Sequence, residues 1–214
     1  MGAVVAVIAR VVEHDHGNIL DAPGWKVCPV NLVPGVMGKG LALEFKRRWP
    51  NLSQIHSNHC HAGLLRPGRV SAPRPGIIFF PTKRHWRDPS RVEDIQAGLE
   101  DLRAMIRDGD IHLFWPWPGI RIDTIAIPAL GCGEGRLSWS LVRPMIIEAL
   151  GMVDVEIHLY APHEVDGGLG EQAAENARRE RVWSSPACIP CEGDIDCATG
   201  EPVRAAGGQM SLFE

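Results

Sequence analysis

A glycine-rich stretch in the first quarter of the chain has the composition of an anion-binding loop. Gly35, Gly38 and Gly40 lie within six residues and flank Lys39. A β-branched segment at residues 26–31 precedes them, and apolar residues at helical spacing follow. Backbone N–H groups between a strand and a helix start can converge on negative charge, so this stretch predicts a phosphate or carboxylate site. An ordinary strand-to-helix turn is the alternative interpretation.

A second glycine-rich loop, Leu-Gly-Cys-Gly-Glu-Gly-Arg-Leu at residues 130–137, follows another apolar segment. Neither loop matches a common nucleotide fingerprint. Lys39 is followed by Gly40 where a Walker loop needs Ser or Thr, and the third glycine of the second loop comes one residue too early for the dinucleotide pattern. The two loops therefore exclude a standard P-loop ATPase or Rossmann dehydrogenase. Together they favour a ligand with at least two phosphate or ribose groups.

The elements that must position these loops alternate along the chain. Strands are predicted at 3–12, 26–31, 69–72, 76–81, 122–128 and 153–160, and helices at 38–49, 51–61, 90–108 and from about 138. Ser90 and Glu93 have the spacing of a capping box at the start of the third helix, after a loop at 82–89. This alternation predicts an α/β fold with a mostly parallel sheet. Ligands bind such sheets beyond the carboxyl ends of the strands, where both glycine loops fall.

Composition narrows the class of protein. The chain has 214 residues, 45% of them hydrophobic, and a net charge of −4, which suits one domain with a core and an appendage. No apolar run approaches the roughly 20 residues of a membrane span, and no basic region precedes the apolar N-terminus, so we expect a cytoplasmic protein with no membrane partner. Residues 163–214 carry 10 acidic and 4 basic residues, against 16 and 18 in residues 1–162. That slightly basic body suits an anionic ligand or limited nucleic-acid contact.

Three blocks of sequence, in this order, resemble the macrodomain superfamily and, within it, the DarG-like DNA ADP-ribosyl glycohydrolase antitoxins. They are Val-Asn at 30–31 with Gly-Val-Met-Gly-Lys-Gly at 35–40, Phe-Pro-Thr-Lys-Arg-His-Trp-Arg at 80–87, and Ile-Pro-Ala-Leu-Gly-Cys-Gly-Glu-Gly-Arg-Leu-Ser-Trp at 127–139. The resemblance implies a three-layer α/β/α macrodomain with a mostly parallel mixed sheet over residues 1–162. Residues 163–214 would then form a C-terminal extension, helical at first and disordered after that.

The resemblance also implies roles for particular residues. Lys83 falls on the family's catalytic lysine, and Asn31 would contact the distal ribose of ADP-ribose. An ammonium can stabilise charge at C1″, or the amine can act as a nucleophile if burial lowers its pKa; a solvated loop lysine is the alternative. Glu134 is either an acid/base group or an exposed carboxylate. The expected ligand contacts are Gly35, Val36, Met37, Gly38, Lys39, Gly40, Thr82, Leu130, Gly131, Cys132, Gly133, Glu134, Gly135 and Arg136. His85, Trp86 and Arg87 would either touch DNA or support the loop.

These roles imply an enzyme that uses no cofactor and no metal. It would remove ADP-ribose from a modified base, thymidine in single-stranded DNA, and so reverse a DNA ADP-ribosyltransferase toxin. Two alternatives remain open: a module that binds ADP-ribose without turnover, and a hydrolase of protein-linked ADP-ribose. Release by the wild-type protein and its loss on Lys83→Ala would separate the enzyme from the binding module.

Two motifs lie in the extension. Cys188 and Cys191 have the spacing of a zinc half-site, with Cys197 as a third thiol, but a fourth ligand is absent, which favours free thiols. The stretch Gln-Met-Ser-Leu-Phe, from Gln209 to Phe213, resembles the short peptide by which bacterial proteins bind the DNA sliding clamp. Leu212 and Phe213 would be its two apolar anchors. This resemblance implies a second partner, the bacterial sliding clamp.

Overall fold

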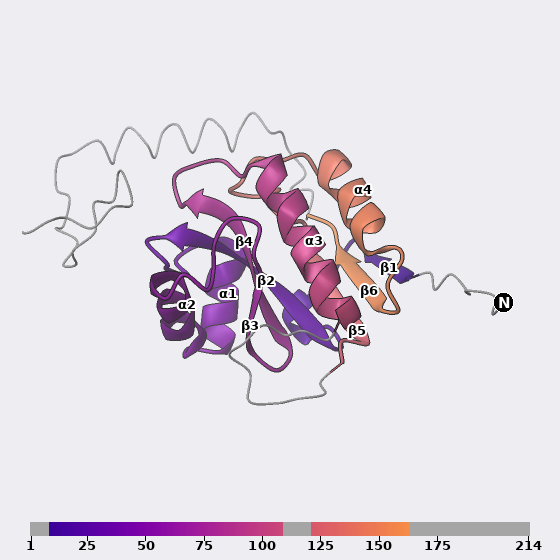
Figure 1. Ribbon diagram of the computed structural model, residues 1–214, viewed down its shortest axis with the longest axis horizontal. Coiled ribbons are helices and arrows are strands. Elements are labelled where there is room, and N and C mark those ends of the chain that lie inside the picture. The colour runs from indigo at the N-terminus through magenta and orange to yellow at the C-terminus, as the bar shows by residue number, and fades with distance from the viewer. Residues whose placement is uncertain (1–8, 109–120, 163–214) are drawn as a thin grey trace, which may run out of the picture. The chain divides into compact units, whose positions relative to one another are not determined.

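The structure is a computed structural model that describes residues 9–108 and 121–162 (Figure 1). The strands of this part of the chain are β1 (Arg10–His14), β2 (Trp25–Val33), β3 (Ser71–Arg74), β4 (Ile77–His85), β5 (Thr124–Pro128) and β6 (Glu156–Tyr160). The helices are the short 3-10 helix η1 (Ile19–Asp21), α1 (Gly40–Arg48), α2 (Leu52–His61), α3 (Val92–Asp108) and α4 (Trp139–Leu150). The predicted α/β class is confirmed. None of the described helices has the length and apolar character needed to span a bilayer.

One mixed sheet forms the centre of the described part. Its strand order is β1-β6-β5-β2-β4-β3, and every neighbouring pair is parallel except β3 and β4, which are antiparallel. The carboxyl ends of β2, β4 and β5 therefore lie at one edge of the sheet. The first glycine-rich loop follows β2, the lysine-bearing stretch ends β4, and the second glycine-rich loop follows β5. The topology brings the three blocks together although they lie about 50 residues apart in the sequence.

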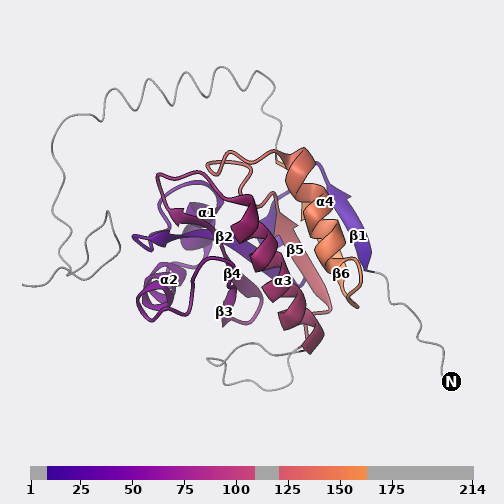
Figure 2. The ribbon, with the colours of Figure 1, turned by 45° about the horizontal axis from the view of Figure 1, so that its top comes forward.

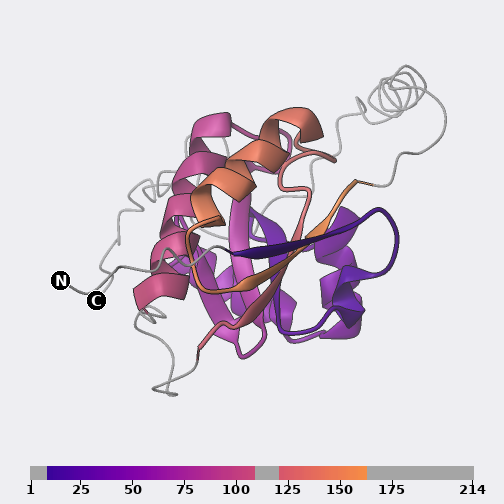
Figure 3. The same ribbon diagram turned by 90° about the vertical axis from the view of Figure 1, so that its right-hand side faces the viewer.

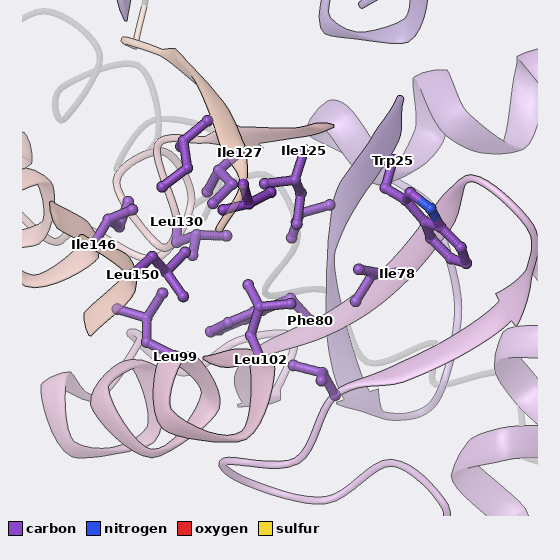
Figure 4. Packing of buried hydrophobic residues seen from close by; sticks show 14 of the residues in the cluster. Trp25, Ile78, Phe80, Leu99, Leu102, Ile125, Ile127, Leu130, Ile146 and Leu150 are labelled. Carbon is purple, nitrogen blue, oxygen red and sulfur yellow. The ribbon is translucent and has the colours of Figure 1, made fainter. Parts of the chain in front are cut away.

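Helices cover both faces of the sheet, which makes three layers. Figures 2 and 3 show α3 and α4 on one face, with α1 and α2 on the other. The first apolar cluster, between the sheet and α3 and α4, includes Phe80, Leu99, Ile125 and Ile146 (Figure 4). The second cluster lies on the opposite face and includes residues of β2, β4, α1 and α2. Burial of these apolar side chains on both faces supplies the main stabilisation of the domain.

The bounds of every strand differ from the predicted ranges, and the first strand and β4 show the differences that matter most. A buried strand at 3–12 was expected, but the strand begins at Arg10 in the described residues, ends at His14, and lies at the sheet edge with Val11 and Val12 only half buried. A β-branched run does not distinguish a central strand from an edge strand. The predicted loop at 82–89 is wrong at its start, because β4 continues to His85. Pairing with β2 holds these polar residues in the strand.

The predicted capping box at Ser90 is also wrong. The helix α3 begins at Val92, and the buried Ser90 hydroxyl has no hydrogen-bond partner within the described residues. Its backbone N–H instead donates to the carbonyl oxygen of Gly135 at 2.9 Å. Ser90 therefore joins the start of α3 to the second glycine-rich loop. Residues 1–8, 109–120 and 163–214 lie outside the described residues, as do the expected helix of the extension and its candidate residues Cys188, Cys191, Cys197, Gln209, Leu212 and Phe213.

Candidate functional site

The register between β2 and β4 places Asn31 directly beside Lys83. Val30 pairs with Pro81, and the next pair is Asn31 with Lys83, so Thr82 is an extra residue in β4. The Thr82 side chain is buried, and its hydroxyl donates to the carbonyl oxygen of Val30 at 3.3 Å. A bulge of this kind changes the direction of the side chains that follow it. It brings the two candidate catalytic residues, 52 positions apart in the sequence, onto neighbouring strands.

Two carbonyl groups hold the Lys83 ammonium. Its Nζ atom donates to the carbonyl oxygen of Trp86 at 2.5 Å and to that of Glu134 at 3.2 Å. Partial burial lowers the pKa of Lys83 from its usual value, while the nearby Glu134 charge opposes that change. The side chain is half buried at the end of a strand. Lys83 is therefore a positioned amine and not a freely solvated loop lysine.

Glu134 connects the two glycine-rich loops. Its carboxylate forms an ion pair with Lys39, with 2.7 Å between Nζ and Oε1, while its carbonyl oxygen accepts the bond from Lys83. The Lys39 and Glu134 side chains are both exposed, so this pair adds little to the free energy of unfolding. Its position matters more than its strength, because one residue contacts a lysine from each of the other two blocks.

The second glycine-rich loop packs tightly at two of its glycines. Gly131 has a φ of +72°, a conformation that favours glycine. A β-carbon on Gly135 would overlap the Ser90 hydroxyl and the Gly131 carbonyl oxygen, whereas a β-carbon on Gly133 would meet nothing within 4 Å. Of the other expected contacts here, Leu130 is buried and Cys132 is half buried. Ser90 and Gly131 therefore pack against the loop at Gly135, whereas the space beside Gly133 is open.

The first glycine-rich loop is anchored in the second apolar cluster. The Met37 side chain is fully buried there, whereas Val36 is half exposed. Gly35 has a φ of +74° and lies close to Cys60 of α2, while Gly38 has open space where its side chain would be. This alternation leaves Val36 and the Gly38 backbone on the outside of the loop. Gly40 begins α1 with a φ of +56°.

The three candidate DNA contacts lie just beyond Lys83. The Trp86 side chain is 48% exposed, and the Arg87 guanidinium lies over its ring, 4.9 Å from the centroid. The His85 ring nitrogen Nδ1 accepts the N–H of Arg87 at 3.3 Å. The N–H of Trp86 donates to the carbonyl oxygen of Val33 at 3.1 Å, which ties this turn to β2. A supporting role and an exposed aromatic surface thus occur in the same three residues.

His56 of α2 is a neighbour of the site that sequence reasoning missed. Its side chain is fully buried, its Nε2 atom donates to the carbonyl oxygen of Asn31 at 2.9 Å, and its ring packs edge-on against Phe79. Burial lowers its pKa to about 4, so the imidazole is neutral near pH 7. The only sequence signal is its position four residues after the buried Leu52 on the same helix face. Through its hydrogen bond to the Asn31 carbonyl oxygen, His56 holds the β2 backbone beside the bulge.

The polar groups at this edge, an amide oxygen acceptor and several cationic donors, suit an anionic, hydroxyl-rich ligand. The Asn31 Oδ1 atom is buried and has no partner within the described part of the chain, so it can accept a hydrogen bond from a ligand. Lys39, Lys83 and Arg136 supply positive charge around it. In residues 9–108 and 121–162 no group of three or more His, Cys, Asp or Glu side chains could hold a metal ion. The arrangement is suited to binding phosphates and ribose hydroxyl groups.

Comparison with solved structures gives close matches in both fold and sequence. The macrodomain of Mycobacterium tuberculosis DarG is 36% identical with a TM-score of 0.61, and that of Thermus aquaticus DarG is 39% identical with a TM-score of 0.60. Each comparison covers 72% of this chain and 99% of the other. DarTG of Thermosipho africanus, solved in complex with ADP-ribose, is 27% identical with a TM-score of 0.61 and matches 74% of this chain and 43% of its own.

Named relatives agree with the structural matches. The DNA ADP-ribosyl glycohydrolase of Thermus aquaticus is 39% identical over 157 residues, which are 70% of this chain and 41% of the relative. The protein of the same name from Mycobacterium tuberculosis is 38% identical over 161 residues. The chain thus spans about two fifths of the length of these relatives, and no family model matches it. From its fold and its identity to two solved DarG macrodomains, this chain belongs to the macrodomain superfamily, in the DarG group.

Proposed function

We propose that this chain is an ADP-ribosyl glycohydrolase that removes ADP-ribose from a modified base in DNA. The observation that carries the proposal is the pairing of Asn31 with Lys83 at the sheet edge where both glycine-rich loops end. A half-buried amine beside an unpartnered carboxamide oxygen is suited to chemistry at a ribose. The relatives at 38–39% identity, named DNA ADP-ribosyl glycohydrolases, support the same reaction.

The reaction is a hydrolysis at the C1″ carbon of the distal ribose. The bond from C1″ to the base nitrogen breaks, the oxygen of a water molecule bonds to C1″, and the water proton goes to the base nitrogen. Free ADP-ribose and an unmodified base are the products. In this mechanism the backbone N–H groups of the second glycine-rich loop hold the diphosphate, and Asn31 accepts a bond from a ribose hydroxyl. Binding of the large ADP-ribose group holds C1″ in place.

Lys83 has two possible roles at C1″, and its protonation state separates them. As an ammonium it stabilises the negative charge that develops on the leaving base. As a neutral amine it attacks C1″ and displaces the base, which takes up the amine proton; water then hydrolyses the bond between lysine and C1″, which releases ADP-ribose and restores the amine. The burial that lowers the pKa of Lys83 favours the neutral form. Glu134, whose carboxylate is exposed and paired with Lys39, is suited to holding the loops more than to exchanging a proton at C1″.

The finer substrate we propose is ADP-ribosylated thymidine in single-stranded DNA, made by a DNA ADP-ribosyltransferase toxin. One relative from Thermosipho africanus, 30% identical, is named a fusion of a DNA ADP-ribosyl transferase with a DNA ADP-ribosyl glycohydrolase. A partner of the transferase type, and an antitoxin role, are consistent with that arrangement. Binding of the sliding clamp through Gln209–Phe213 is a separate prediction that rests on the sequence motif alone.

The test uses a single-stranded oligonucleotide with one ADP-ribosylated thymidine. We expect the wild-type protein to release unmodified DNA, and Lys83→Ala to lose at least about a hundredfold in kcat. Lys46→Ala is the matched control, because Lys46 is an exposed lysine of α1. Calorimetry with ADP-ribose shows whether a protein that does not release ADP-ribose from DNA still binds it. Binding of ADP-ribose without release from DNA would show a binding module or a hydrolase of protein-linked ADP-ribose, and would overturn the proposal.

A further inference from the structure

Trp86 is an exposed tryptophan whose backbone is fixed beside Lys83. Its backbone N–H donates a hydrogen bond to the carbonyl oxygen of Val33 at the end of β2. Its own carbonyl oxygen accepts a hydrogen bond from the Lys83 ammonium at 2.5 Å. The backbone of Trp86 is therefore held by the two strands that carry the candidate catalytic residues. Trp86 is nevertheless 48% exposed, although tryptophan is on average a highly buried residue. Packing alone does not account for this ring.

The immediate surroundings of the ring are cationic. The Arg87 guanidinium lies over it at 4.9 Å from the centroid, and the His85 ring is 6.1 Å away. Six basic and two acidic residues occur in the three stretches at this edge, 34–40, 83–91 and 129–140. The basic residues are Lys39, Lys83, Arg84, Arg87, Arg91 and Arg136, and the acidic ones are Asp88 and Glu134. Lys39 is paired with Glu134, and Arg84 with Asp94 of α3, so the cation that lies directly against the ring is Arg87. A flat aromatic ring among positive charges is the combination that binds single-stranded nucleic acid.

From this geometry we propose that Trp86 is a stacking platform for a base of the single strand that carries the modified nucleotide. In this proposal the Arg87 guanidinium packs over one face of the indole and also neutralises a backbone phosphate of the bound strand. The proposal rests on the proposed function, because it requires the modified base to lie at Lys83. The hydrogen bond from the Lys83 ammonium to the Trp86 carbonyl oxygen shows that the two residues are neighbours at this edge. The proposal requires the next base along the strand to reach the indole while C1″ faces the amine. Duplex DNA would keep that base stacked on its neighbours, so the platform selects single strands.

The test compares one reaction on two substrates that differ only in the flanking bases. The first is ADP-ribosylated thymidine as a mononucleotide, and the second is the same nucleotide in the middle of a short single strand. We expect Trp86→Ala to lower the ratio of kcat/KM for the strand to that for the mononucleotide by about tenfold, mainly through KM. Trp86→Phe, which keeps an aromatic face, should keep most of the wild-type ratio. Met152→Ala removes another exposed apolar side chain, in the turn after α4, and should leave the ratio unchanged.

An unchanged ratio in Trp86→Ala, whether or not both rates fall, would overturn the proposal, because it would show that the flanking base gains nothing from the indole. Failure of the proposed function has a different signature: the wild-type protein would then cleave neither substrate. In that case the affinity for the labelled, ADP-ribosylated strand, measured by fluorescence anisotropy, tests whether Trp86 stacks on a base. A loss of affinity of about tenfold in Trp86→Ala, restored in Trp86→Phe, would support it, and equal affinities would refute it.

Discussion

Arg136 has a backbone conformation that usually requires glycine. Its φ is +64°, in the left-handed region where a β-carbon costs about 1 kcal/mol. We therefore expect Arg136→Gly to increase the free energy of unfolding by about 0.5 kcal/mol, because relief of this strain exceeds the added flexibility of the unfolded chain. The melting temperature should rise by about 2 °C. Arg136→Ala is the matched control, since it removes the guanidinium and keeps the β-carbon. An equal rise in both variants would assign the effect to charge.

His56 predicts a pH dependence of stability. Its pKa is about 4 in the folded protein and 6.5 in the unfolded chain, so the unfolded chain binds more protons between these values. The contribution is present above pH 6.5 and is lost as the pH falls toward about 4. Between about pH 7 and about pH 5, urea unfolding should therefore show a His56 contribution of about 2 kcal/mol to the loss of stability in the wild type, in addition to that of His59, whose pKa burial also lowers.

His56→Gln should abolish that part of the loss, because glutamine keeps an N–H donor for the Asn31 carbonyl and does not titrate. His61→Gln is the control, since His61 is exposed on the same helix. It should keep the wild-type pH dependence. A His56→Gln variant that loses as much stability as the wild type between the two pH values would show that other groups cause the effect.

At the scale of elements, Gly98 sets the distance between α3 and the sheet. A β-carbon at this position would lie 2.5 Å from the Phe80 ring, which is fully buried in β4. Gly98→Ala should therefore destabilise the protein by about 2 kcal/mol, although alanine has the higher helix propensity. In a Phe80→Leu background the same substitution should be neutral or stabilising, because the ring no longer opposes the methyl group. A double-mutant cycle by urea unfolding measures this coupling. Additive effects would contradict the prediction.

The order of strands and helices, the parallel sheet and the meeting of the glycine-rich loops at one edge could all be predicted from local patterns. The bulge at Thr82 could not, because it depends on the pairing of two strands 52 residues apart. The same pairing extends β4 through Lys83 and His85, which local composition assigns to a loop. Ser90 resembles a helix cap in sequence but packs against the second glycine-rich loop. His56 likewise looks like any polar helix residue until α2 is placed under β2. Each of these features depends on contacts between residues far apart in the sequence, which local patterns do not reveal.

At the scale of the whole molecule, charge is divided between two parts of the chain. Residues 1–162 carry a net charge of +2 and residues 163–214 a net charge of −6. The solved DarG macrodomains match 72% of this chain with 99% of their own length, which supports residues 1–162 as a unit that folds alone. We therefore propose that the fragment 1–162 melts cooperatively and binds ADP-ribose within about twofold of the full chain.

The same division of charge predicts how the extension affects DNA binding. Removal of residues 163–214 changes the net charge from −4 to +2, so the fragment should bind an unmodified single strand more tightly than the full chain. The difference should be clear at about 50 mM salt and small at about 200 mM, because salt screens long-range repulsion. Anisotropy with one labelled oligonucleotide at both salt concentrations measures it. A full chain that binds as tightly as the fragment at low salt would show that the acidic extension does not repel the strand. Weaker binding by the fragment would place a DNA contact within residues 163–214.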